Sequence, residues 1–327
     1  MTGPVGHLPV LLDTVLELLA PRPGGTVADL TAGRGGHALA MAQAVAPGGR
    51  VLLCDLDAGN LAFAAGRVRE VAGIEVAPVH GSFARADRDA ARLGWAADAV
   101  LADLGFASTQ MDDPARGFSF QAEGPLDMRL DASRGETAAD VLARIRESEL
   151  ADAIFELGED PFARRIARTI VDRRAKAPLR TTQDLASAVV AAYGARARDS
   201  RMHPATRTFM ALRILVNDEL GALRTLLAAL EQGGREAAAA LRSPSPASTV
   251  PSPGWLRPGC RVGIISFHSL EDRLVKHAMA DWERAGLGER VTRKPAEASE
   301  AELAANRRAR SAKFRVFRFA AEMRPDR

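Results

Sequence analysis

The sequence predicts an α/β protein in which a parallel sheet is interrupted by a long helical insertion. Short apolar runs alternate with helical patterns as far as Asp103. Strands that alternate with helices imply a parallel sheet wound by right-handed crossovers. From 113 to 215 the strand-like runs disappear, and Ala- and Arg-rich segments with helical spacing replace them. The strand pattern resumes at 261–267, so the sheet is expected to continue after the insertion.

The elements of the first third follow from apolar spacing and from the turn residues between them. A helix over 7–20 is expected to end at the Pro- and Gly-containing turn 21–25. Strands are expected over 26–30, 50–55, 74–79 and 99–103, with helices over 38–45 and 60–71 between them.

The second half of the chain is expected to contain four further features. Residues 203–220 are predicted to form one amphipathic helix, and another helix follows from Ser269. The segment 233–258, rich in Ala, Ser and Pro, is predicted to be a mobile loop. The alternating run 316–319 is predicted to be an edge strand. The expected domain division is a sheet domain in two parts, 1–112 and 216–327, around a helical substrate-recognition domain, 113–215.

The net charge of +3 conceals an uneven distribution. Residues 160–214 carry twelve Lys and Arg against four acids, and residues 290–318 carry nine against three. Two basic stretches favour a polyanionic partner, usually nucleic acid, although solvated helix faces would give the same counts. Neither a signal peptide nor a membrane-spanning run is recognisable, and Cys54 and Cys260 lie in apolar strand-like segments. A cytoplasmic protein with buried thiols and no metal site is expected.

Residues 26–37, TVADLTAGRGGH, predict a ligand-binding turn. A small apolar strand ends at Asp29 and passes through a glycine-rich loop into a helix, whose first N–H groups suit a polar or anionic ligand. Asp55 follows the second strand, where a nucleoside-binding unit places the carboxylate that holds the ribose hydroxyls. The dinucleotide spacing G-x-G-x-x-G is absent, so S-adenosyl-L-methionine, which has no pyrophosphate, fits better. A tight turn without any ligand is the alternative.

Several loops are expected to converge on one edge of the sheet. In open parallel sheets ligands lie at the carboxyl ends of the strands. Gly33–His37, Asp55, Phe83 and Asp103 all follow predicted strands and would meet at this edge.

Long blocks of the sequence resemble the bacterial ribosomal RNA small subunit methyltransferase H family, also called the MraW type. They are HLPVLL (7–12), AGRGGH (32–37), DLGFASTQMDDPARGFSF (103–120), GPLDMRLD (124–131), HPATRTFMALRILVNDEL (203–220), ISFHSLEDRLVK (265–276) and NRRARSAKFRV (306–316). The resemblance implies a class I (Rossmann-like) methyltransferase sheet with an inserted all-helical domain. It also implies methylation, with S-adenosyl-L-methionine, of the N4 amino group of a decoding-centre cytidine in 16S ribosomal RNA of the small subunit.

The resemblance also assigns site residues. The cofactor contacts it implies are Gly35, Gly36, His37, Asp55, Phe83, Asp103 and Gln110. The sequence departs from the family pattern at Leu30, at the Phe106-Ala107 pair and in the length of 233–258. None of these departures falls on an implied cofactor residue, so only loop geometry is put in question.

Two residues are candidates for catalysis. The N4 atom of cytosine is a weak nucleophile, and a carboxylate that accepts a hydrogen bond from the amino group would assist it. Asp103 is placed for this role or for holding the cofactor, and capping of the next turn is the structural alternative. His268, between a strand and a helix, is the second candidate, against a packed loop histidine. Asp272 is predicted to be the capping partner of Ser269.

Seven arginines are candidates for RNA binding. Arg116 and Arg129, near Phe118 and Phe120, could form a cationic and aromatic surface for an unpaired base, although the two rings could equally belong to the core. The other five lie on the 203–220 helix and in the basic stretch near the end of the chain: Arg207, Arg213, Arg307, Arg308 and Arg310.

Two other functions remain to be distinguished from rRNA methylation. A DNA amino-methyltransferase would carry an Asp/Asn-Pro-Pro-Tyr/Phe signature, whereas residues 103–106 read DLGF. A non-catalytic RNA-binding or ribosome-assembly factor would not need Asp55, Asp103 and the glycine loop. The sequence does not determine the oligomeric state.

Overall fold

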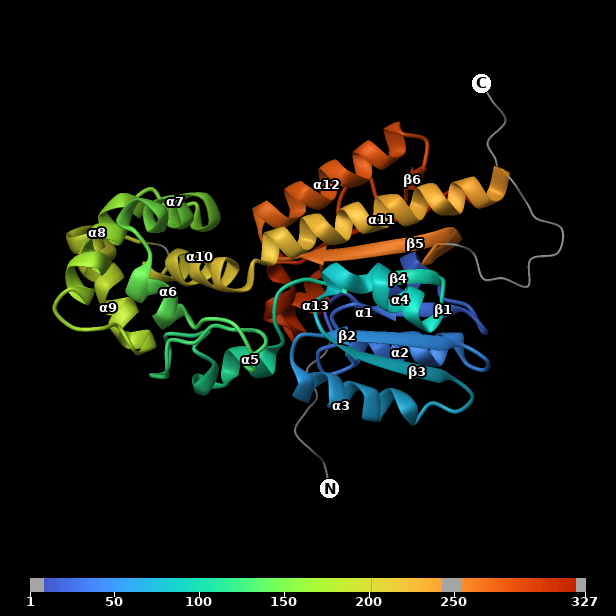
Figure 1. The fold of residues 1–327 in the computed structure, drawn as a ribbon, viewed down its shortest axis with the longest axis horizontal. Coiled ribbons are helices and arrows are strands. Elements are labelled where there is room, and N and C mark those ends of the chain that lie inside the picture. The colour runs from blue at the N-terminus through green and yellow to red at the C-terminus, as the bar shows by residue number, and fades with distance from the viewer. Residues whose placement is uncertain (1–8, 201, 243–253, 322–327) are drawn as a thin grey trace. The chain divides into compact units, whose positions relative to one another are not determined.

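The protein consists of two compact units, shown in the computed structural model of Figure 1. Residues 106–220 form one unit, which we call the helical unit. The chain on either side of it, 1–105 and 221–327, forms the other, which we call the sheet unit. The predicted insertion boundaries, 113 and 215, fall inside the helical unit close to its two ends. The structure describes residues 9–200, 202–242 and 254–321.

The sheet unit is built on seven strands in the order β3-β2-β1-β4-β5-β7-β6. Strands β1 to β5 run parallel, and β7 is antiparallel to both β5 and β6. This arrangement confirms the predicted class I methyltransferase sheet. The strands are β1 (Thr26–Asp29), β2 (Arg50–Asp55), β3 (Glu75–His80), β4 (Ala97–Asp103), β5 (Leu256–Ser266), β6 (Gly288–Arg290) and β7 (Lys313–Phe319).

Helices cover both faces of this sheet, because successive strand residues point to opposite sides. On one face Val27 and Val51 pack with α1, α2 and α3; on the other Ala28 and Leu52 pack with α4, α11 and α12. No helix in the described ranges is both long enough and apolar enough to cross a membrane. The helices of this unit are α1 (Leu12–Leu19), α2 (Gly36–Val45), α3 (Ala58–Arg69), α4 (Ala86–Leu93), α11 (Glu219–Arg242, entering from the helical unit), α12 (Ser269–Arg284) and α13 (Glu300–Ala305).

The prediction of an edge strand at 316–319 is wrong. Strand β7 lies inside the sheet between β5 and β6, and the sheet ends at β6. Phe317 and Phe319 are buried and pack with Trp282 of α12, at ring-centroid distances of 5.3 and 5.6 Å. Strand β6 has only three residues and no apolar alternation, so no local pattern indicated that another strand would cover β7.

The predicted loop over 233–258 is wrong at both ends. Helix α11 continues to Arg242, and β5 begins at Leu256. Gly233 and Gly234 let the helix approach the sheet closely: a Cβ on Gly234 would lie 2.0 Å from the Phe319 ring. Trp255 is buried in the core. The remainder of the predicted loop, 243–253, lies outside the described residues.

The described residues of the helical unit form six α-helices: α5 (Ser108–Asp112), α6 (Ala138–Arg144), α7 (Glu147–Gly158), α8 (Ala163–Arg174), α9 (Thr182–Tyr193) and α10 (Ala205–Asn217). Its core includes Ile154, Ile166, Ile170 and Leu212, all fully buried. The single helix predicted over 203–220 is instead two helices. The chain breaks at Asp218, which has a left-handed backbone conformation with φ of 47° and lets α11 start in a new direction.

Candidate active site

Three glycines follow β1, namely Gly33, Gly35 and Gly36, and their surroundings differ. Gly35 has φ of 75°, and a Cβ there would lie 3.0 Å from Ala64 of α3. At Gly36 a Cβ would lie 3.1 Å from Pro9. Close packing therefore explains why these two positions hold glycine, and their cofactor contacts stay a prediction. Gly33, which the sequence-based assignment omitted, has φ of 50°, and a Cβ there would make only an ordinary contact, 3.9 Å from the Thr31 carbonyl oxygen.

Asp55 ends β2, as predicted, and holds the glycine loop. Its Oδ2 atom accepts a hydrogen bond of 2.7 Å from the Gly33 N–H, and its Oδ1 atom accepts one of 2.8 Å from the Asp57 N–H. Burial raises the pKa of the Asp55 carboxyl, and these two hydrogen bonds oppose the increase. Each carboxylate oxygen has a second lone pair, so contact with two ribose hydroxyls remains possible.

Phe83 follows β3 and begins the short 3₁₀ helix η1 (Phe83–Arg85). Its side chain is partly buried and packs against the core on the α4 side of the sheet. A ring with one side on the core and part of its surface exposed is suited to an aromatic ligand, and this contact stays a prediction.

His37 lies beside Asp103, the residue that ends β4. The Nε2 atom of His37 is 2.8 Å from the Val10 carbonyl oxygen, so Nε2 carries the hydrogen and Nδ1 faces Asp103. Burial lowers the pKa of His37 to about 4, so the ring is neutral near pH 7. The 3.7 Å distance from Nδ1 to Asp103 Oδ2 is therefore neither an ion pair nor a hydrogen bond.

Asp103 has unused bonding capacity. Its Oδ1 atom is buried and has no hydrogen-bond partner in the described part of the chain. Burial raises the pKa of Asp103 well above 3.8, and the carboxyls of Asp29 and Glu271 raise it further. The backbone N–H of Asp103 donates to Thr31 Oγ1 at 2.7 Å, which ties the end of β4 to the glycine loop. A carboxyl in this state takes up a proton readily and lacks a partner.

Asp29, at the end of β1, is a third buried carboxyl at this edge. Its Oδ1 atom accepts a hydrogen bond from the Thr31 N–H at 3.1 Å. Burial raises the pKa of Asp29 to about 7, and the nearby charge of Asp55 adds to the increase. The sequence marked Asp29 as the end of a strand but did not place it among the site residues.

His268 caps α12 and is turned toward its own helix. Its Nε2 atom lies 3.2 Å from Glu271 Oε1, but the two are poorly aligned, so we count no hydrogen bond there. The other oxygen of Glu271 accepts from the Phe267 N–H at 2.9 Å, and Glu271 is buried. The sequence predicted Asp272 as the capping partner of Ser269; the N-cap is instead His268, one residue earlier, so Glu271 takes that place. Asp272 instead pairs with Arg315 at 2.7 Å.

Gln110, the last predicted cofactor residue, belongs to the helical unit. It is buried in α5, where its Oε1 atom accepts a hydrogen bond of 2.9 Å from the Ala107 N–H. The other predicted cofactor residues all belong to the sheet unit. They lie at the ends of β1 to β4 or shortly after them, as the sequence predicted.

Four of the predicted RNA-binding arginines bond within the helical unit. Arg116 donates to the Leu130 carbonyl at 2.8 Å, and Arg207 donates to the Glu159 carbonyl at 2.8 Å. Arg129 pairs with Asp127 at 2.7 Å, and Arg213 forms a two-pronged pair with Glu219 at 2.8 and 3.0 Å. Within the helical unit these side chains hold loops and helices together.

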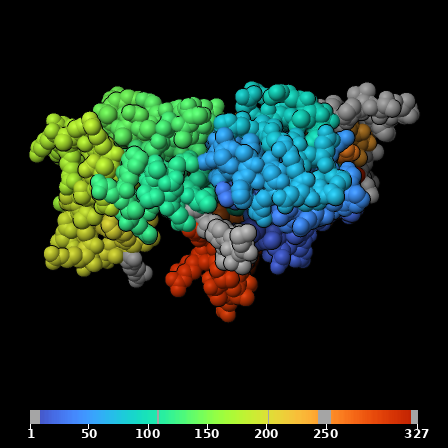
Figure 2. Space-filling view, turned by 90° about the horizontal axis from the view of Figure 1, so that it is seen from below, coloured from blue at the N-terminus to red at the C-terminus, as the bar shows by residue number. Residues whose placement is uncertain are grey.

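The other three candidates lie at the surface. Arg307, Arg308 and Arg310 are all exposed on the 3₁₀ helix η4 (Arg307–Ser311) of the sheet unit. This part of the chain, red in Figure 2, stands out on the surface. RNA binding by these arginines stays a prediction.

Known proteins resemble this chain over almost its whole length. The MraW methylase family matches residues 4–241 and 248–320. A protein named ribosomal RNA small subunit methyltransferase H from Nitratidesulfovibrio vulgaris is 43% identical over 97% of this chain and 86% of its own length. Relatives of the same name from Sorangium cellulosum and a Synechococcus species are 44% and 45% identical, covering 95% and 96% of this chain and 90% and 97% of their own lengths.

These matches support methyl transfer as the reaction and S-adenosyl-L-methionine as the cofactor. Both agree with the sheet topology and with the carboxyl groups at the strand ends. From the extent of the match, we conclude that the chain belongs to the MraW methylase family.

Proposed function

We propose that this protein uses S-adenosyl-L-methionine to methylate the N4 amino group of a decoding-centre cytidine in 16S ribosomal RNA of the small subunit. The family and the name shared by its relatives support ribosomal RNA as the substrate. The observation that carries the proposal is the buried Oδ1 atom of Asp103, which has no partner among the described residues and lies at the end of β4. The reaction is proposed to take place in the cytoplasm.

The residues at this edge fit a positively charged sulfonium cofactor. Asp29, Asp55 and Asp103 supply carboxyl groups, and the neutral His37 adds no repelling positive charge. We assign Asp55 to the ribose hydroxyls, Phe83 to the adenine ring, and Gly35, Gly36, His37, Asp103 and Gln110 to the remaining contacts.

Asp103 carries the chemistry that the chain itself supplies. When bound, the cofactor offers an electrophilic methyl group. Asp103 accepts a hydrogen bond from the cytosine amino group, aligns it, and takes the proton that N4 loses. The positive charge that the cofactor carries when bound would lower the pKa of Asp103 and so favour the ionised form that can accept this proton. His268, whose Nδ1 atom accepts a hydrogen bond of 3.5 Å from the Glu271 N–H, is assigned to orienting the base or a phosphate.

Mapping the methylated nucleotide tests the proposal directly. Small subunits from cells without the gene are incubated with purified protein and cofactor, and the rRNA is digested and analysed by mass spectrometry. We expect N4-methylcytidine at one decoding-centre position. Methyl groups on another atom or base, or transfer to DNA but not to subunits, would refute it. Cofactor binding without any transfer would favour an assembly factor.

A further inference from the structure

The arginines of the helical unit fall into two groups. Those predicted to bind RNA donate to protein acceptors, as described above. The side chains of Arg164 and Arg165, at the beginning of α8, make no hydrogen bond, ion pair or ring contact in the described part of the unit. A guanidinium has five N–H donors in a fixed fork that matches phosphate geometry, so an exposed pair without acceptors has all of these donors available.

The sequence of α8 directs these arginines outward. Ala163, Ile166 and Ile170 are buried on one side of the helix, and Arg164, Arg165 and Arg168 are exposed. Arg168 approaches Glu147 of α7 at 3.4 Å, with 73% and 42% of the two side chains exposed. Exposed pairs of this kind contribute little energy, so a phosphate could replace Glu147 as the partner of Arg168 at small cost.

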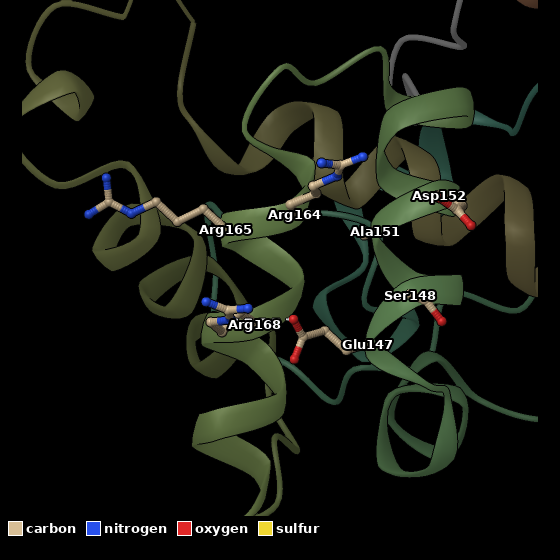
Figure 3. A pocket seen from close by; sticks show the side chains of 7 residues that line it. All are labelled: Glu147, Ser148, Ala151, Asp152, Arg164, Arg165 and Arg168. Atoms are coloured by element: carbon tan, nitrogen blue, oxygen red, sulfur yellow. Dashed lines mark hydrogen bonds and ion pairs between the residues drawn. The ribbon is translucent and has the colours of Figure 1, made fainter.

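The three arginines line an open groove of about 840 Å³ between α7 and α8, which we call the α7–α8 groove. Glu147, Ser148, Ala151 and Asp152 form its other side. Figure 3 shows Asp152 directed away from the arginines, whereas Glu147 points toward Arg168. The arginine side therefore presents more positive charge than its neighbours neutralise.

Aromatic side chains lie near this basic surface. Phe155 is 62% exposed and follows Ala151 by four residues, so it lies on the same side of α7 one turn further along. Arg196, in the 3₁₀ helix η3 (Gly194–Ala197), lies over the Phe162 ring at 5.6 Å, near the beginning of α8. An exposed aromatic ring such as Phe155 beside guanidinium groups is suited to single-stranded RNA, whose bases stack while its phosphates pair.

We propose that the α7–α8 groove binds phosphates of the ribosomal RNA substrate through Arg164, Arg165 and Arg168, an assignment that rests on the function proposed above. The groove belongs to the helical unit and contains none of the residues assigned above to the cofactor or to the reacting base. It therefore contributes to affinity and to the salt dependence of binding, and not to the chemical step.

The test uses the full-length protein and isolated small subunits as the probe. The double variant Arg164→Glu/Arg165→Glu should bind subunits about tenfold more weakly at physiological salt. The slope of log K against log salt should become smaller by roughly 1.5 to 2, as expected for two lost phosphate contacts. KM for subunits should rise, while turnover at saturating subunits and cofactor affinity should stay within about twofold of the unaltered protein.

Matched variants isolate the effect of position. Arg69→Glu/Arg88→Glu changes the charge equally on exposed sites of α3 and α4, and it should retain at least most of the affinity. Arg164→Lys/Arg165→Lys keeps the charge and should bind nearly normally. If the Glu double variant matches the α3/α4 control in affinity and slope while the unaltered protein methylates rRNA, the groove assignment is overturned. If the unaltered protein transfers no methyl group to rRNA, the proposed function fails instead.

Discussion

The charged residues of the two units differ in how their bonding capacity is used. In the sheet unit, Asp29 and Asp103 are held at strand ends with raised pKa values, and one oxygen of Asp103 has no partner in the described chain. In the helical unit, Arg129 and Arg213 are neutralised by Asp127 and Glu219. Incomplete pairing of buried groups carries a free-energy cost, so it indicates a binding site better than the number of charges does.

The largest expected effect concerns the buried carboxyl of Asp29. Its pKa is raised to about 7, so folding favours the neutral form; the associated stability is present at low pH and is lost as pH rises from about 4 to about 7. Asp29→Asn removes this dependence. Between about pH 4 and pH 8, the free energy of unfolding should fall by roughly 4 kcal/mol more in the unaltered protein than in the variant. Urea unfolding of the unaltered protein and of the variant, without cofactor and at several pH values, measures this difference. If the free energy of unfolding changes equally with pH in both proteins, the prediction is contradicted.

Asp103→Asn separates catalysis from cofactor binding. Asn keeps the size and one acceptor but cannot take up the proton from N4, so turnover should fall about a hundredfold, or roughly 2.7 kcal/mol. Cofactor affinity should change much less. The turnover number and the Michaelis constant for the cofactor are measured with small subunits as substrate, and the exposed Asp13→Asn is the control. A tenfold rise in the cofactor constant with nearly normal saturated turnover would show that Asp103 only holds the cofactor.

The pH dependence of turnover provides a second measurement on Asp103. Because the pKa of this carboxyl is raised well above 3.8, turnover should fall as pH decreases through that pKa. The Asn variant should lack this decrease. If turnover falls in the same way at low pH in both proteins, a group other than Asp103 causes the decrease.

Asp55→Ala should weaken cofactor binding by about 2–3 kcal/mol, as expected for hydrogen bonds to a charged group. Part of the loss comes from the loop, because Asp55 also accepts from the Gly33 N–H. Titration calorimetry measures the affinity, and circular dichroism verifies the fold. Native folding together with unchanged affinity would remove Asp55 from the site.

Arg213→Ala tests the structural role of the paired arginines in the helical unit. It should destabilise the protein by about 2 kcal/mol, because Glu219, whose side chain is only 10% exposed, loses its partner. Stacking of Arg213 on Phe106, at 4.8 Å, is lost as well. Arg165→Ala is the matched control and should change stability by less than about 0.5 kcal/mol. Both values come from urea unfolding. If Arg213→Ala weakens RNA binding and leaves stability unchanged, Arg213 binds RNA and does not have a structural role.

The sequence predicted the carboxyl edge well because strand ends are local features. Apolar runs that stop at Asp55 and Asp103 place these residues at the same edge whatever the details of packing. Glu271 was missed because its effect on Asp103 depends on β5 lying beside β4, a pairing of segments far apart in the chain.

Features set by long-range packing were predicted poorly. Gly234 reads as a loop residue locally, yet it is glycine because Phe319 lies against it. The sequence did not reveal the partners of the arginines either. Arg213 lies on one face of the helix predicted over 203–220, and only the chain break at Asp218 brings Glu219 within reach of it. Local patterns determine where a charged residue lies along an element, whereas its partners depend on the fold.

The position of β7 inside the sheet has a consequence for synthesis of the chain. Residues 313–319 are made only after the whole of 106–220, yet they fill the sheet between β5 and β6. The helical unit is one continuous segment and can fold as soon as it has emerged. Until β7 arrives, β5 has an unpaired edge, which is where one nascent chain can pair with another. Shielding of β5 by chaperones is therefore expected to matter most during the final stage of translation.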